Sequence, residues 1–598
     1  MSKTDLVLLH APSVYDFRQK AILYGPVSDL IPSSPVFEMY PLGFLTITNY
    51  LEERGFRVRI VNLALRMIND RRFDVCRFVK RLRPKAFGID LHWLPHAHGA
   101  IEIAKIVKSL HPDIPVIFGG LSASYFHNEL IRYPQVDFVL RGDATEPLLC
   151  HLLTNLSDQR KLAAIPNLTW KTVDGEVRVN PLEFVPANID YSDIAPQRIV
   201  RMVLRHRDLQ SVLPFNGWWQ NPITAVFTVK GCAHQCITCG GSSQANALLN
   251  QRQVPALRSP HSLVKNILDI SRISNGPIFL VGDLYQGGTD YAETTLELLS
   301  KEKLKNEIVF EIFGMPPLDY LHKIDRSVHN WSLELSPESH DEKIRQRQDR
   351  HVSYSNSQME EVIATALTLS CHRVDLFFMI GLPLQTRESV RQTISYCQHL
   401  FRTSDSRLSC FISPMGPFLD PGSFCFEDAS LCGYRLRATT LEEHRNLLIQ
   451  PSWKQILNYE TAWMNRDDLV AATYEAAETL NNLKLEYGRI SRIRGEQVAG
   501  RIARAKALEA RLSSHDHTTL DLESFKALEG EINEFSVSTV CDKQELYWRR
   551  HLLNFKWPAI LNICLRDLFS RHRPAKRSAL PAAPPWEHPE SISKVQIH

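Results

Sequence analysis

The first 150 residues alternate short apolar runs with segments of helical periodicity. Apolar runs that predict strands lie at 6–9, 57–61, 86–89, 114–118 and 136–140. Helices are expected over 41–55, which Pro41 opens and Gly55 ends, and over 101–110. This alternation predicts an α/β domain over 1–150, with a Rossmann-like, doubly wound parallel sheet.

A second alternating region covers 223–428. Its apolar runs predict six further strands, at 225–229, 277–283, 308–313, 331–335, 374–380 and 408–412. Helical segments such as 262–273 and 357–370 lie between these runs, so we expect parallel strands with crossover helices. In such an arrangement, polar residues at the strand ends line the active site.

The segment 151–222 is predicted to link these two regions. It contains a short strand at 167–170 and a hairpin turn at 173–175. Trp218 and Trp219 stand next to each other just before the second region. They either close a domain boundary or pack over a cofactor.

The pattern changes again after about residue 428. One helical face collects the residues Leu469, Ala472, Ala476, Leu480, Leu483 and Tyr487. Further helices are expected over 489–512 and 544–569, so 429–570 is predicted to be an all-α domain. Residues 571–598 contain five prolines by position 589 and are predicted to be a disordered tail.

Composition narrows the classes of protein to consider. The chain has 598 residues, of which 44% are hydrophobic, and its net charge is +3. This length predicts several domains, and the near-balanced charge argues against nucleic acid or a membrane as the main partner. No run of 18 uncharged apolar residues occurs, so no transmembrane segment is expected. Twelve cysteines without a disulfide-type spacing, together with an N-terminus that does not read as a signal peptide, predict a reducing cytoplasm.

Three cysteines follow the strand predicted at 225–229. Cys232, Cys236 and Cys239 form a CxxxCxxC pattern between Gly231 and the pair Gly240-Gly241. Thiolates bind iron–sulfur clusters and zinc, and a structural zinc site needs a fourth ligand. A cubane held by three thiolates leaves one iron with an open position. The motif therefore predicts such a cluster, with a zinc-stabilised binding protein without catalysis as the alternative from another class.

This pattern resembles the signature of the radical S-adenosylmethionine (SAM) superfamily. The α/β domain upstream of the motif resembles the cobalamin-binding members, on the segments 40–43, 118–122 and 141–143. The resemblance covers most of residues 1–420. It implies a partial (β/α)6 radical SAM barrel at 223–428, and a 4Fe-4S cluster, SAM and cobalamin as cofactors.

The resemblance also implies a chemistry. SAM bound to the open iron is cleaved reductively to a deoxyadenosyl radical, which activates an unreactive carbon. Methyl transfer from cobalamin is the expected reaction, and cyclisation or carbon–carbon bond formation without cobalamin is the alternative. The expected partners are a small-molecule, lipid or peptide substrate and an electron donor such as flavodoxin or ferredoxin.

Site residues follow from the same resemblance. Those expected near SAM are Ile237, Gly240, Asp283, Glu334 and Gly381. Ser336 and Glu338 accompany Glu334 on the fourth barrel strand. Glycine at 381 is expected to let the backbone approach the adenine closely. Those expected near cobalamin are His92, Gly119, Gly120, Leu121, Ser122 and Gly142.

No histidine is expected to bind the cobalt. His10 follows the first strand, but the residues after it do not form the Asp-x-His-x-x-Gly motif of many cobalamin domains. Asp90-Leu91-His92 supplies Asp-x-His after the third strand, without the glycine. His92, His96 and His98 therefore form either a polar loop or a contact with the nucleotide tail.

Overall fold

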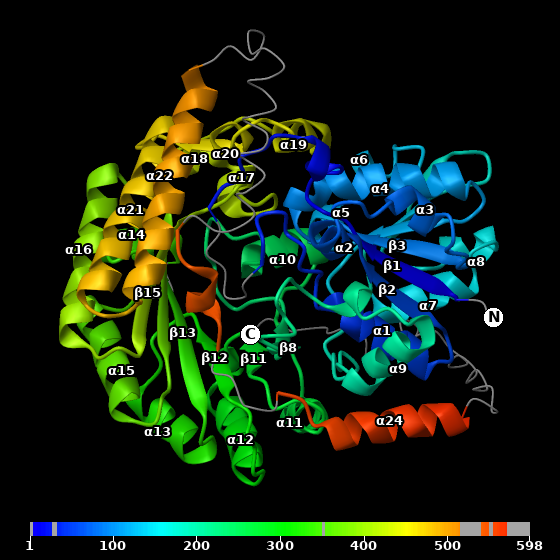
Figure 1. Ribbon diagram of the computed structural model, residues 1–598. Coiled ribbons are helices and arrows are strands. Elements are labelled where there is room, and N and C mark those ends of the chain that lie inside the picture. The colour runs from blue at the N-terminus through cyan, green and yellow to red at the C-terminus, as the bar shows by residue number, and fades with distance from the viewer. Residues whose placement is uncertain (1–3, 27–32, 350–352, 515–539, 549–553, 571–598) are drawn as a thin grey trace, which may run out of the picture.

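The structure is a computed structural model, and it describes residues 4–26, 33–349, 353–514, 540–548 and 554–570. An N-terminal α/β domain lies against a barrel-like second sheet, and long helices cover the far side of that second sheet (Figure 1).

The N-terminal sheet has the strand order β2-β1-β3-β4-β5-β6-β7. Its parallel strands are β2 (Val58–Asn62), β1 (Leu6–His10), β3 (Ala86–Asp90), β4 (Val116–Gly119) and β5 (Phe138–Leu140). Side chains alternate between two faces, so Val7 and Leu9 pack with α4 (Ala97–Leu110), while Leu6 and Leu8 pack with α1 (Gly43–Glu53). The predicted doubly wound sheet is confirmed.

The same sheet continues beyond the boundary placed at residue 150. The strands β6 (Leu168–Lys171) and β7 (Val177–Val179) extend it in antiparallel pairing, joined by the predicted hairpin turn. Gly175 in that turn has φ +81°, a conformation that glycine adopts without steric cost. The N-terminal α/β unit therefore reaches Val179, and the connection to the barrel consists of the segment with α9 (Pro196–His206).

The second sheet contains the six predicted barrel strands in chain order. They are β8 (Thr224–Phe227), β11 (Ile278–Val281), β12 (Ile308–Ile312), β13 (Trp331–Glu338), β14 (Val374–Ile380) and β15 (Leu408–Pro414), and all neighbours pair in parallel. The helices α11 (Pro260–Ser271), α12 (Thr289–Ser300), α13 (Leu318–Ser327), α15 (Asn356–Thr368) and α16 (Arg387–Thr403) cover its outer face. The strands β8 and β15 are the two edges, as expected for a partial barrel.

The C-terminal region is mainly helical, as predicted, but it is not separate from the barrel. The helices α21 (Arg466–Glu486) and α22 (Arg492–Ser514) share one hydrophobic core with β14 and β15. Two short strands, β16 (Tyr434–Leu436) and β17 (Tyr459–Thr461), form an additional antiparallel pair.

The last described segments differ from the helix expected over 544–569. Residues 543–546 form a short 3-10 helix, and α24 (Trp557–Ser570) begins only at Trp557. Contacts of Glu545 and Trp548 with the barrel override the helical preference of this segment. The predicted tail, 571–598, lies outside the described residues. In the part of the chain that the structure describes, no helix has the length and hydrophobicity to span a bilayer.

Candidate active site

The cluster loop, residues 231–241, leaves the carboxyl end of the barrel sheet through β9 (Val229–Lys230). Gly231 has φ +82°, and a Cβ there would lie 2.6 Å from Cδ of Arg252, so glycine is required at this turn. The backbone N–H of His234 donates to Sγ of Cys232 (3.4 Å), and that of Gly241 donates to Sγ of Cys239 (3.3 Å). Such bonds stabilise thiolates in the geometry that a cluster needs.

Electrostatics keep the three free thiols protonated. Burial raises the pKa of Cys232 and Cys236 above the usual thiol range and that of Cys239 to about 12, with the nearby carboxylates of Glu311, Glu338 and Asp420 adding to the effect. A strong positive charge at this place would favour loss of the thiol protons. A metal centre supplies that charge.

The donor set fits an iron–sulfur cluster. Among the described residues, no three His, Cys, Asp or Glu side chains converge as ligands of a single metal ion. A cubane takes each thiolate on a different iron atom, so three free cysteines within one short loop are a chemically suitable donor set.

Five contacts from four separate segments hold the cluster loop. Side-chain oxygens of Gln286, Asp349 and Asp420 accept backbone N–H groups of Ala233, Gln235 and Gly240. The backbone of Ile237 donates to the carbonyl of Gln348 and accepts from the N–H of Cys425, both at 2.9 Å. Sequence reasoning missed these anchors, because no local pattern marks them.

Gln348 makes the most central of these contacts. It is the last residue of α14 (Glu342–Gln348), and its Nε2 donates to Oγ1 of Thr238 (2.9 Å) and to Oε2 of Glu338 (3.1 Å). Its Oε1 is buried without a hydrogen-bond partner among the described residues. A ligand that carries N–H or O–H donors could satisfy this buried acceptor.

Replacing Gln348 by alanine is expected to loosen the cluster loop. The variant loses two buried hydrogen bonds, one to Thr238 of the loop and one to Glu338 of β13, each worth about 1 kcal/mol. We expect iron binding to weaken and 5′-deoxyadenosine formation from SAM to fall about tenfold. Iron per chain after anaerobic reconstitution and product analysis check this. Gln346→Ala, on the exposed side of α14, is the matched control; equal behaviour of the two variants would contradict the role of Gln348.

The turn at Gly282 and Asp283 follows β11 beside the cluster loop. The N–H of Gly282 donates to Oε2 of Glu311 (2.9 Å), and the hydroxyl of Thr228 donates to the carbonyl of Gly282 (3.0 Å). Burial raises the pKa of Asp283 to about 6, although its carboxylate accepts the N–H of Tyr285 (2.8 Å). A buried carboxylate next to the cluster suits an ammonium group.

On β13, the structure places Glu338 rather than Glu334 next to the cluster loop. Glu334 lies in mid-strand, level with Glu311 on β12 and Asp375 on β14. Glu338 follows a register shift at the strand end, has φ +61°, and lies close enough to Cys236 to raise the pKa of its thiol. Burial raises the pKa of Glu338 itself to about 7.

Neighbouring side chains leave no room for a Cβ at the two glycines expected near SAM, Gly240 and Gly381. Gly381 has φ +106°, and a Cβ there would lie 2.5 Å from the hydroxyl of Tyr459. A Cβ at Gly240 would lie 2.8 Å from Cβ of Asp420. Tyr459 therefore fills the position next to Gly381 where a side chain would extend.

The residues predicted near cobalamin meet at the carboxyl edge of the N-terminal sheet. Gly120 has φ +116°, and a Cβ there would lie 2.6 Å from the backbone of His92. The hydroxyl and N–H of Ser122 donate to the carbonyl of His92, and Gly142 donates to the hydroxyl of Ser124. Leu121 opens α5 (Leu121–Tyr125), directly after Gly120. The structure thus brings the loops after β3, β4 and β5 together, as the sequence predicted.

Two buried histidines at this edge already have partners. Nδ1 of His10 pairs with Asp90 (3.0 Å), and its Nε2 contacts the carbonyl of Phe37 (3.0 Å). Nε2 of His96 contacts the same carbonyl at 2.7 Å. His92 is half-buried, and burial lowers its pKa to about 4, so its imidazole is neutral. His98 accepts the N–H of Tyr15 on the outer side of this loop.

Gly119 and Gly120 give a matched test of this edge. A Cβ at Gly119 meets only the carbonyl of Leu140, at 3.7 Å, so Gly119→Leu is expected to fold and to obstruct the cofactor. Gly120→Ala clashes with backbone and is expected to cost about 2 kcal/mol or more of stability. Thermal unfolding and corrinoid bound per chain distinguish the two effects. Normal corrinoid binding by Gly119→Leu would place the cofactor elsewhere.

The cluster loop faces the carboxyl edge of the N-terminal sheet, where the residues predicted near cobalamin lie. Nζ of Lys230, directly before the loop, donates to the carbonyl of Asp143 (2.6 Å) and contacts Glu146 (3.3 Å). Arg252 makes a two-point contact with the carboxylate of Asp143. These residues tie the end of β5 to the segments on both sides of the cluster loop.

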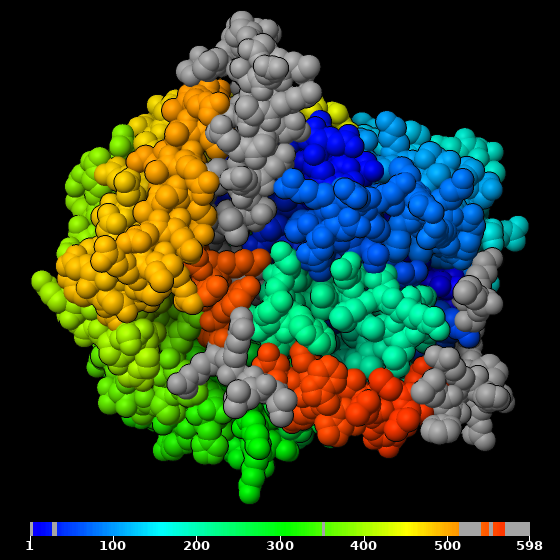
Figure 2. Space-filling model, viewed as in Figure 1, coloured from blue at the N-terminus to red at the C-terminus, as the bar shows by residue number. Residues whose placement is uncertain are grey.

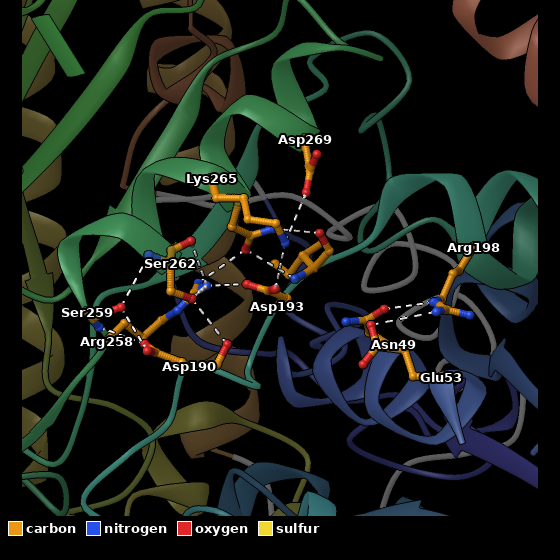
Figure 3. A network of polar contacts seen from close by, with 12 residues as sticks. Asn49, Glu53, Asp190, Asp193, Arg198, Arg258, Ser259, Ser262, Lys265 and Asp269 are labelled. Atoms are coloured by element: carbon orange, nitrogen blue, oxygen red, sulfur yellow. Dashed lines mark hydrogen bonds and ion pairs between the residues drawn. The ribbon is translucent and has the colours of Figure 1, made fainter. Parts of the chain in front are cut away.

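A polar network farther from the cluster joins α1, α9 and α11 (Figure 3). The fully buried Arg258 pairs with Asp193, and Asp190 accepts from Ser259 at the start of α11. Arg198 donates to Asn49 (2.7 Å) across a cavity of about 280 Å³ between these helices. The lining of the cavity includes the ion-paired residues Glu53, Asp193 and Lys265 and none of the residues predicted for the site.

The comparisons with known proteins agree with this geometry. Residues 30–149 match the B12 binding domain family. A cytidylyl-2-hydroxyethylphosphonate methyltransferase from Streptomyces wedmorensis is 23% identical over 278 residues, which are 40% of this chain and 50% of that enzyme. This chain therefore spans about half the length of that curated relative.

Two solved structures share the fold. TsrM from Kitasatospora setae, a radical SAM methyltransferase with tryptophan and a SAM analogue bound, superposes with a TM-score of 0.54 at 15% identity over 73% of this chain and 79% of TsrM. OxsB, a cobalamin-dependent SAM radical enzyme, gives 0.51 at 14% identity over 95% of this chain and 80% of OxsB. The chain has a B12 binding domain and the fold of the cobalamin-binding radical SAM enzymes, which confirms the predicted resemblance.

Proposed function

We propose that this protein is a cobalamin-dependent radical SAM methyltransferase. The observation that carries the proposal is the position of Cys232, Cys236 and Cys239, on a loop at the carboxyl end of a six-stranded parallel sheet. That loop faces the edge of a B12 binding domain across the contacts of Lys230 and Arg252 with Asp143.

Each group of residues has a task in this reaction. The three thiolates hold the cluster, and Gln286, Gln348 and Asp349 keep the loop in one conformation. Asp283 and Glu338 offer carboxylates for the ammonium and ribose hydroxyls of SAM. When bound, the cluster, SAM and cobalamin supply reductive radical formation and methyl transfer, which no amino-acid side chain can provide.

The N-terminal edge is proposed to hold cobalamin through backbone and small side chains. Gly119, Leu121, Ser122 and Gly142 present such groups around the ends of β4 and β5. His10 has both ring nitrogens engaged, so no imidazole from the loop after β1 is available to the cobalt. We also infer a cytoplasmic location and a reduced flavodoxin or ferredoxin as electron donor, since the cluster needs a low-potential electron.

The deciding experiment is metal and corrinoid analysis of protein purified without oxygen from cells supplied with cobalamin. We expect about four irons per chain and a bound corrinoid. Methyl-labelled SAM would then be given with candidate acceptors, and transfer of the label measured. Iron without corrinoid would redirect the search to radical reactions without methyl transfer, and zinc without SAM cleavage would refute catalysis altogether.

A further inference from the structure

The helix α24 carries an apolar stripe that faces solvent. Trp557, Leu561 and Leu565 follow one another at intervals of four residues, and their exposed fractions are 46%, 59% and 53%. Residues at this spacing share one helical face. The helix lies on the molecular surface next to α11 and below α9, along its whole length (Figures 1 and 2). Large side chains in such a row are normally covered by another apolar surface.

The stripe continues onto Trp219, in the segment that precedes β8. Trp219 is 40% exposed, stacks on Phe555 at 4.8 Å between ring centroids, and lies 6.3 Å from the ring of Trp557. Backbone hydrogen bonds from Asn275 to Asn554 and from Lys556 to Ile273, both 2.8 Å, fix the start of α24 to the barrel. The exposed face is therefore a rigid platform that combines tryptophan and leucine.

Positive charge surrounds this platform. Arg566 lies on α24, and Lys556 lies directly before this helix. Burial lowers the pKa of Lys556, and the charge of the nearby Lys305 lowers it further. Lys301 and Lys303 are exposed just before Lys305, with Glu302 between them. Asp567 on α24 is acidic, and basic residues still outnumber acidic ones in this group.

We propose that this platform, Trp219, Trp557, Leu561 and Leu565 with its lysine and arginine rim, docks on the surface of an anionic lipid bilayer. Tryptophan and leucine enter the boundary between headgroups and acyl chains, and the basic rim pairs with anionic headgroups. A second copy of this chain would bring the same positive rim and would be repelled.

The position of the platform is compatible with catalysis. Phe555 bridges to Ser274, before β11, so α24 lies at the amino end of the barrel strands. The cluster loop lies at their carboxyl end. Docking through α24 therefore leaves the proposed active site facing away from the bilayer and open to its partners.

Vesicle flotation with the full-length protein tests the proposal. We expect binding to vesicles of phosphatidylglycerol and phosphatidylcholine, little binding to phosphatidylcholine alone, and release by high salt. The triple variant W557S/L561S/L565S is expected to bind at least about tenfold more weakly. The matched control V173S/L431S/I493S changes three other exposed apolar residues and should bind like the parent protein.

Three outcomes would overturn the proposal. The first is a parent protein that does not float with anionic vesicles, and the second is a triple variant that floats as well as the control. The third is a dimer in sedimentation analysis that is lost in the triple variant, because a second copy would then be what covers the stripe. Circular dichroism of the variant confirms that the comparison is made between folded proteins.

Discussion

Alanine at Cys232 is expected to abolish SAM cleavage. The change removes one of three thiolates, and two are too few to hold a cubane, so bound iron should fall from about four per chain to below one. Formation of 5′-deoxyadenosine should fall by about a thousandfold or to background, because the radical originates at the cluster. Anaerobic iron analysis and product chromatography measure both.

The fold and the cobalamin edge should survive this change. Cys232 lies half-buried on a loop, and the residues around Gly119 belong to a separate sheet. Corrinoid retention should therefore equal that of the parent protein. Cys76→Ala, which changes an exposed cysteine on α3 (Val75–Val79), should keep both iron and activity. Persistent SAM cleavage in the Cys232 variant would refute the assignment of the cluster.

Local sequence patterns were sufficient for the two sheets and for the position of the cluster loop. Buried parallel strands are short and nearly all apolar, so runs such as Leu6–His10 and Val374–Ile380 are recognisable without tertiary information. The three cysteines were equally visible, because their spacing lies within eight consecutive residues. Both signals depend only on neighbours in the chain.

The supports of the site were not predictable in this way. Gln348 acts on Thr238, more than 100 residues earlier, and no periodicity marks such a pair. The steric surroundings of the glycines at 120 and 381 could not be predicted either. Backbone atoms of His92 and the side chain of Tyr459 lie where a side chain at these positions would extend. Contacts between distant segments decide these details.

The segment 540–548 is a further case in which contacts between distant segments override a local sequence pattern. Its sequence favours a helix, but the structure uses it to bridge the barrel. Arg373 at the start of β14 donates to the carbonyls of Glu545 and Tyr547 and lies over the ring of Trp548. On the other side, Lys543 donates to the carbonyl of Asn216, before β8. The segment thus connects the region before the edge strand β8 with the start of β14.

Loss of the ion pair that anchors this segment is expected to have the largest effect on stability. Nζ of Lys484 on α21 lies 2.7 Å from Oε2 of Glu545, with side-chain exposures of 3% and 7%. Burial disfavours the charge on Lys484, but Glu545 outweighs burial and the pKa of Lys484 is raised. Lys484→Ala leaves the Glu545 carboxylate buried without its cation, which should cost about 3–5 kcal/mol.

Urea unfolding of Lys484→Met, Glu545→Leu and the double variant distinguishes the interaction between the two charges from the packing of their side chains. Each single change leaves one buried charge uncompensated, whereas the double variant leaves none, so it should be more stable than either single variant. Lys506→Ala breaks the exposed pair with Glu478 on the neighbouring helices and should change stability little. If the effects of the two single changes add up in the double variant, the two charges do not interact, and the position of 540–548 depends on its other contacts, such as those of Arg373, Trp548 and Lys543.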